Sequence, residues 1–236
     1  MNIKDAVILI TGANRGLGRS LTTALLAAGA RKVYAGARRP QEGGDPRIVP
    51  LPLDVTSAAD IAAAAAVAGD VTIVINNAAI DAGSPVLGAN AADSARREFE
   101  TNYFGPMAIS QAFAPILAAN GGGAIVNILS ALSWVNMSRH GTYSTSKAAA
   151  WSLTNGTRAE LAAQNTLVVG VHLGYMDTDM TDGIDAPKVK PEDVANAVVA
   201  GIEAGDEEVL ADGTAQYVKA EMAAKRPIYL GAPRAA

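Results

Sequence analysis

The 236-residue chain contains no cysteine, only two histidines and few aromatic residues. Without cysteine there are no disulfides, thiol nucleophiles or thiolate metal sites, which suits a reducing compartment. No apolar run approaches the ~20 residues of a membrane-spanning helix, and the N-terminus enters a strand pattern with no room for a signal peptide. The net charge is −4 and basic runs are lacking, which argues against nucleic acid as a partner. These absences favour a cytoplasmic protein that acts on small molecules away from membranes.

The two histidines, His140 and His172, lie 32 positions apart in a loop pattern and a strand pattern. Neither has a second or third ligand at the spacing of a metal site. We therefore expect no bound metal.

Short apolar runs alternate with alanine-rich helical stretches along the whole chain, whose length fits one domain with a large core. Strands are expected at 5–11, 32–36, 48–55, 71–77, 123–130, 166–174 and in "EEVLA", and helices at 17–28, 58–68, 93–119 (two), 143–164, 191–204 and 214–224. Such apolar strands alternating with helices predict a parallel sheet covered on both faces. We predict an α/β fold, a Rossmann-type doubly wound parallel sheet in a single domain over residues 1–236, with a polar loop at 38–47.

A glycine-rich turn, "TGANRGLG" (11–18), follows the first expected strand. Glycines at this junction let a phosphate approach the backbone and meet free amides at the positive end of a helix. The spacing is G-x-x-x-G-x-G, not the common G-x-G-x-x-G, and no G-K-[ST] ending indicates a nucleoside-triphosphate loop. A tight structural turn is the alternative, but the position at the first strand–helix junction favours a phosphate site.

The second expected strand is followed by Ala37 and Arg38, where an acidic residue would favour NAD. Arg38 and Arg15 suit a ribose 2′-phosphate instead, because guanidinium groups form forked bonds to phosphate oxygens. The two residues could equally be plain exposed arginines. We predict NADP(H) in preference to NAD(H).

The stretch "GTYSTSKAAAW" (141–151) places Tyr143 and Lys147 on one face of a helix. Ser130 ends a strand, at the edge where ligands of such sheets bind. Asn102 is a polar residue in an otherwise apolar helical region. Packing explains each residue taken alone.

Together these residues resemble the classical short-chain dehydrogenase/reductase family, carbonyl reductase-like members included. The matching segments cover about three-quarters of the chain: "TGANRGLG", "LDV" (53–55), "NNAA" (76–79), Asn102, Ser130, "YSTSK" (143–147) and "GYMDTDM" (174–180). Their order and the interval of 13 residues between Ser130 and Tyr143 match as well.

The resemblance implies an NADPH-dependent enzyme that reduces a ketone or aldehyde to an alcohol, reversibly. Tyr143 would be the general acid, Ser130 would bind the substrate oxygen, and Asn102 would order a water that connects Lys147 to solvent. Lys147 would hold the nicotinamide ribose and lower the pKa of Tyr143 from about 10.

The resemblance also implies the contacts of the cofactor, whereas Thr11 is expected to tie the first strand to its neighbours. The expected cofactor residues are Gly12, Asn14, Arg15, Gly16, Leu17, Gly18, Arg38, Asp54, Val55, Asn76, Ala78, Tyr143, Lys147, Gly174 and Thr178. The substrate pocket is expected to include Trp134, Asn136, Met137 and Tyr175, with packing as the alternative for each.

Two residues depart from the family pattern: Ala79 stands where glycine is common, and Leu173 where proline is usual. We expect the leucine to alter the geometry of the substrate loop. Only ten residues separate Met180 from Pro191, which predicts either an open pocket for bulky carbonyl compounds or a trimmed surface loop.

We expect a homodimer or homotetramer, because the helix beginning at Tyr143 is rich in small residues and such helices, with the one containing Asn102, pair in relatives. Alanine bias alone would give the same pattern. Arg158 and Glu160 are expected to be solvated or at a subunit contact.

Two other functions compete with the reductase. A non-catalytic dinucleotide-binding sensor or scaffold would be expected to lack the tyrosine or lysine, and a serine hydrolase would need a G-x-S-x-G turn that is missing. Epimerase and dehydratase relatives have different glycine spacing and longer substrate domains.

Overall fold

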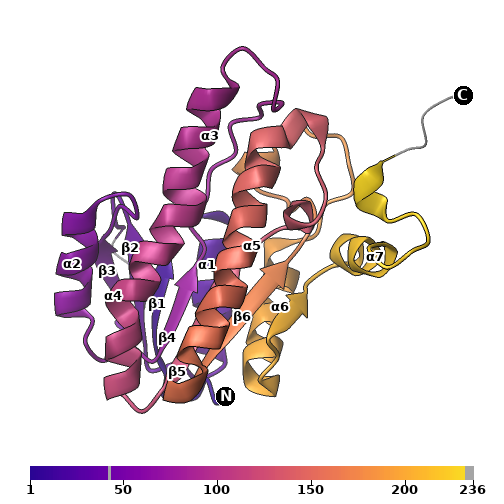
Figure 1. Cartoon of the computed structure of the whole chain (residues 1–236). Helices are drawn as coiled ribbons and strands as arrows, with labels where there is room; N and C mark the ends of the chain where they lie inside the picture. The colour runs from indigo at the N-terminus through magenta and orange to yellow at the C-terminus, as the bar shows by residue number, and fades with distance from the viewer. Residues whose placement is uncertain (42–43, 232–236) are drawn as a thin grey trace, which may run out of the picture.

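The computed structural model describes residues 1–41 and 44–231, and within them seven parallel strands form one sheet in the order β3-β2-β1-β4-β5-β6-β7 (Figure 1). The strands are β1 (Val7–Thr11), β2 (Lys32–Ala37), β3 (Ile48–Pro52), β4 (Ile73–Asn76), β5 (Gly123–Ile128), β6 (Thr166–His172) and β7 (Glu208–Leu210). The helices are α1 (Gly16–Ala27), α2 (Ala58–Val67), α3 (Ala91–Phe99), α4 (Gly105–Ala119), α5 (Gly141–Leu161), α6 (Pro191–Ala204) and α7 (Gly213–Glu221). The predicted doubly wound α/β fold is confirmed. Of the loop expected at 38–47, residues 42–43 lie outside the described residues.

Successive side chains of each inner strand enter two different cores. On β1, Ile8 and Ile10 belong to the core beneath α1 and α6, whereas Val7 and Leu9 belong to the core beneath α2 and α4. Because side chains alternate across a strand, a strand covered on both faces must be apolar at every position. This requirement explains the unbroken run "VILI" and the complete burial of these four residues.

Most boundaries differ from the expected ones by a few residues, and three of the differences have a clear local cause. β3 ends at Pro52, because Asp54 turns the chain by accepting hydrogen bonds from the N–H and hydroxyl of Thr56. The two helices expected within 93–119 are joined by a π-helical turn, Glu100–Phe104, into one continuous rod. α5 begins at Gly141, two residues early, where a Cβ would lie 2.6 Å from the backbone nitrogen of Val86 and glycine alone fits.

The direction of chain progression reverses between β1 and β4, which are neighbours at the centre of the sheet. Loops that follow the two strands diverge there and leave a crevice at the carboxyl edge, the place where ligands bind in such sheets. No helix among the described residues is long and apolar enough to cross a membrane.

Candidate active site

A cavity of about 1620 Å³ lies at the carboxyl ends of the strands and extends from the glycine loop to the start of α5. Every residue predicted for the site lines this cavity except Gly18, Asn76, Asn102, Trp134 and Asn136. Segments far apart in the sequence therefore meet here, as parallel strands require.

The glycine loop is shaped so that the backbone comes close to the cavity. Gly12 and Gly16 line it and have φ of +68° and +50°, a region that other residues adopt rarely. Gly18 lies behind them, where an added Cβ would be 2.2 Å from the carbonyl oxygen of Gly12. This tight cradle at the amino end of α1 fits a bound pyrophosphate group.

Thr11 anchors the loop to the neighbouring strand, as expected. Its hydroxyl oxygen accepts hydrogen bonds from the N–H groups of Asn77 and Ala78, each at 3.0 Å, and the side chain is buried.

Basic side chains border the end of the cavity next to β2. Arg15 forms an exposed ion pair with Asp179, with 2.7 Å between Nη1 and Oδ2. Arg38 and Arg39 are exposed on the same rim, and the carbonyl oxygen of Arg39 accepts a hydrogen bond from the amide of Asn14. Arg39 was not anticipated from the sequence, although it follows Arg38 directly.

Lys147 is buried on α5, and its Nζ donates a hydrogen bond of 2.7 Å to the carbonyl oxygen of Ile128 at the end of β5. Burial lowers the pKa of Lys147 to about 8. The same Nζ lies 5.8 Å from the centre of the Tyr143 ring.

The pKa of Tyr143 is raised above its usual range, first because burial penalises the phenolate and then because Asp81 and Glu98 are negatively charged. A hydrogen bond with the Ser130 hydroxyl acts in the opposite direction. The prediction that Lys147 lowers this pKa is therefore wrong for the cofactor-free protein. Burial and the two carboxylates together set the direction of this pKa shift.

Asn102 lies in the π-helical turn and is buried. Its amide donates 2.9 Å hydrogen bonds to the carbonyl oxygen of Ile80 and to the hydroxyl of Ser146, and its oxygen accepts one from the N–H of Ile80. It thus ties the loop after β4 to α5 from behind the cavity instead of lining it.

Asn76 is also displaced from its expected place. Its side chain is buried within the sheet and donates to Asn127 Oδ1 at 2.8 Å, whereas the next residue, Asn77, lines the cavity and donates to the carbonyl oxygens of Thr11 and Gly12. The strand alternation decides which of two identical neighbours reaches the ligand side.

The four residues predicted for the substrate pocket divide evenly. Met137 and Tyr175 line the cavity, with the Tyr175 hydroxyl 4.0 Å from the Met137 sulfur. Trp134 is buried and stacks on His172, with ring centres 3.7 Å apart, and the exposed Asn136 donates to the carbonyl oxygen of Gly141. Packing, the alternative interpretation, holds for Trp134.

Two further residues of the cavity wall, Asp81 and His140, were not anticipated as site residues. The sequence contained one signal for His140. This residue precedes Tyr143 by three positions, and residues at that spacing share a face of a helix. His172 does not line this cavity, and its Nδ1 lies 3.0 Å from the carbonyl oxygen of Ser130.

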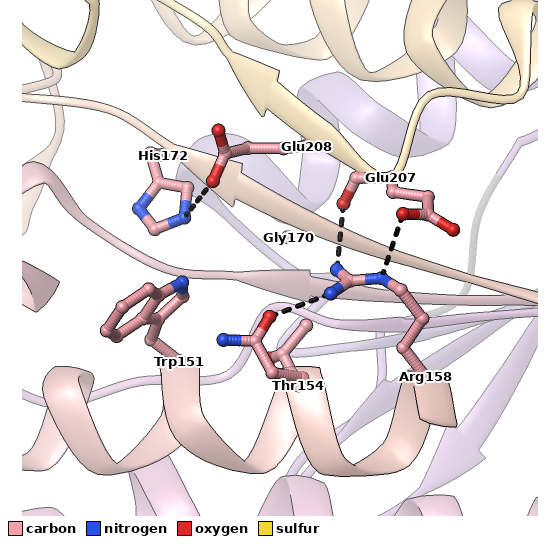
Figure 2. Close-up of a pocket in the computed structure, with 8 residues that line it drawn as sticks. Trp151, Thr154, Arg158, Gly170, His172, Glu207 and Glu208 are labelled. Carbon is pink, nitrogen blue, oxygen red and sulfur yellow. Dashed lines mark hydrogen bonds and ion pairs between the residues drawn. The ribbon is translucent and has the colours of Figure 1, made fainter. Parts of the chain in front are cut away.

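A second, smaller cavity of about 230 Å³ lies between α5, β6 and β7 (Figure 2). Arg158 reaches across it and donates to the carbonyl oxygens of Val168 and Glu207, each at 3.0 Å. Arg158 is therefore only partly solvated, because its guanidinium joins α5 to the edge of the sheet; the subunit contact stays a prediction. Glu160 is exposed.

The strand order and the glycine cradle define a dinucleotide-binding α/β protein. Residues 6–188 match the sequence model of the family described as short chain dehydrogenase, and the chain belongs to this family. It is therefore an oxidoreductase whose fold binds a nicotinamide dinucleotide.

Three relatives illustrate the similarity. The chain is 30% identical over 245 residues to dehydrogenase/reductase SDR family member 7B of Xenopus tropicalis, covering 89% of this chain and 78% of the frog protein. A short chain dehydrogenase from Burkholderia cenocepacia in complex with NADP is 43% identical, with a TM-score of 0.91 over 96% of each chain. The 3-ketoacyl-(acyl-carrier-protein) reductase of Brucella melitensis, complexed with NADH, shares the fold at 23% identity, with a TM-score of 0.80 over 87% of this chain and 96% of that one.

Proposed function

We propose that the protein is an NADPH-dependent reductase that converts a ketone or aldehyde to an alcohol, reversibly. The observation that carries the proposal is the convergence of Tyr143, Ser130 and Lys147 on one cavity, next to a glycine cradle that fits a pyrophosphate. The substrate is a small molecule, in keeping with the family.

Tyr143 is in the protonation state that reduction of a carbonyl requires. The phenol keeps its proton at neutral pH, and the protonated form is the one that a general acid needs. Tyr143 donates this proton to the substrate oxygen, while the Ser130 hydroxyl bonds to the same oxygen and stabilises its developing charge. The reduced nicotinamide, when bound, supplies the hydride.

Lys147 holds the nicotinamide ribose and supports Tyr143 once a ligand fills the cleft. Its Nζ already has one fixed acceptor, the carbonyl oxygen of Ile128, which leaves two N–H groups when it is protonated. Asn102 acts on the site indirectly, because its hydrogen bonds hold the loop at Ile80 against α5.

The preference for NADP(H) rests on the basic rim at Arg15, Arg38 and Arg39, where a 2′-phosphate finds forked donors. The NADP held by the Burkholderia relative supports it. The NADH of the Brucella protein shows that the fold admits either dinucleotide.

The test is oxidation of NADPH and of NADH, followed by absorbance with a panel of ketones, for the wild type and Tyr143→Phe. We expect wild-type turnover to be faster with NADPH and to fall by about 100-fold or more in the variant, because the proton donor is lost. Tyr217→Phe, an exposed tyrosine on α7, is the matched control and should leave turnover unchanged.

Equal turnover by Tyr143→Phe and wild type would refute the proposed chemistry. Tight NADPH binding with no turnover of any ketone by the wild type would favour the alternative, a non-catalytic dinucleotide-binding sensor or scaffold.

A further inference from the structure

Asp81 and His140 form a buried pair in the wall of the cavity that the proposed chemistry does not use. Asp81 follows β4 and His140 immediately precedes α5, and Oδ2 and Nδ1 are 2.7 Å apart. Their side chains are only 12% and 7% exposed. The other carboxylate oxygen of Asp81 accepts a hydrogen bond from the N–H of Gly83, so the carboxylate is held at both oxygens.

The pair leaves one polar atom without a partner. An ionised carboxylate only accepts, so Nδ1 of His140 is the donor in either charge state of the ring. The opposite ring nitrogen, Nε2, is buried and makes no hydrogen bond within the described residues. A buried polar atom left unpaired costs about 1–3 kcal/mol, which a ligand that pairs with it would recover.

The residue that carries this atom belongs to the wall of the cavity, near Tyr143. His140 and Tyr143 are three residues apart at the start of α5, and both line the cavity. The His140 ring also meets the edge of Tyr175, with ring centres 6.0 Å apart. A compound whose carbonyl oxygen reaches Tyr143 therefore occupies the same cavity that His140 lines.

We propose that the site takes a carbonyl compound with a hydroxyl group near the reacting carbon, and that Nε2 of His140 binds this hydroxyl while Asp81 fixes the ring. The inference rests on the proposed reductase function and names its substrate class. A hydroxyl both donates and accepts, so it pairs with Nε2 whether or not that nitrogen carries a proton. An acidic group is disfavoured, because the negative charges of Asp81 and Glu98 already act on Tyr143.

The experiment compares 1-hydroxy-2-butanone with 2-butanone as substrates of the wild type, His140→Phe and Asp81→Ala. We expect the wild type to prefer the hydroxyketone by about tenfold or more in kcat/KM, since a site built to bond a hydroxyl rejects the analogue without it. The preference should fall to about one in His140→Phe, which keeps an aromatic side chain but loses both ring nitrogens. It should also fall in Asp81→Ala, which frees the ring to turn.

Arg139→Ala is the matched control, because Arg139 is exposed next to His140 and does not line the cavity. It should keep the wild-type preference. NADPH binding, followed by tryptophan fluorescence, verifies that each variant is folded, and Asp81→Ala carries the test if His140→Phe does not fold.

A preference that persists unchanged in both variants, or a wild type with no preference, would overturn the role of His140. Either result is separable from failure of the reductase proposal, which shows as undiminished turnover in Tyr143→Phe.

Discussion

Lys147 illustrates how one buried group serves both stability and chemistry. Its ammonium lies within the protein with a single carbonyl partner, so burial lowers its pKa from 10.5 to about 8. A buried ionisable group lowers the free energy of unfolding of the protein without its ligand. Such groups are common in functional sites, because their charge acts on the ligand.

The lowered pKa predicts that the cofactor-free protein becomes more stable between pH 8 and pH 10.5. In this range the unfolded chain keeps the lysine proton that the folded protein has lost, so stability rises with pH. Relative to Lys147→Met, the wild-type free energy of unfolding should increase by about 3 kcal/mol over the interval and be constant below pH 8. Urea unfolding at four pH values measures the difference, and a pH-independent difference would contradict the buried charge.

At the scale of a single element, the turn between β1 and α1 also serves both the fold and the proposed phosphate site. Thr11, held under the N–H groups of Asn77 and Ala78, sets where β1 ends, and the glycines then bring the chain around without side chains. The proposed phosphate site is therefore formed by backbone atoms. A side chain added at one of these glycines would change its shape.

Gly18→Ala should abolish NADPH binding and lower the melting temperature, because its Cβ would lie 2.2 Å from the backbone oxygen of Gly12 and 2.9 Å from Cα of Ala13. Gly213→Ala, where a Cβ meets nothing within 4 Å, is the matched control and should change neither property. Calorimetry with and without NADPH gives both values. A Gly18→Ala protein that binds like the wild type would rule out the close approach of backbone to phosphate.

At the scale of the whole molecule, part of the surface of α5 is left uncovered by the residues that the structure describes. Gly156 on this helix has no atom within 4 Å of the position of a Cβ, and Phe104, in the turn that packs beside α5, is 43% exposed. Small residues on an open helix face allow a second helix to approach closely. We propose that copies of this chain associate through α5 and the helix beside it, as a homodimer or homotetramer.

Light scattering at micromolar concentration should give a mass at least twice the 24.0 kDa of one chain. Gly156→Arg should shift the mass towards that of the monomer without loss of helix content, since the single chain has room for the side chain and arginine favours helices. Ala220→Arg, at an exposed position of α7, is the control and should leave the mass unchanged. A wild-type protein of monomer mass would refute this assembly.

The order of strands and helices could be predicted from the sequence because strand burial on two faces leaves a local trace, unbroken apolar runs such as "VILI". Tyr143 and Lys147 were recognisable for a similar reason, since residues four positions apart on a helix share a face wherever that helix lies. Ser130 could be placed because it comes two residues after β5, whose carboxyl end faces the crevice. Local periodicity thus determined the fold class and the position of these three side chains.

Contacts between distant segments were decided only by the tertiary structure. Asp81 and His140 are 59 positions apart in the sequence. They form a pair because the loop after β4 and the start of α5 lie at the same edge of the sheet. Trp134 stacks on His172 and does not line the cavity. The pKa of Tyr143 rises instead of falling because the fold buries the phenol and brings two carboxylates from other segments near it. A sequence gives only the spacing of residues along the chain. Charge, burial and stacking depend on which distant segments the folded sheet brings into contact.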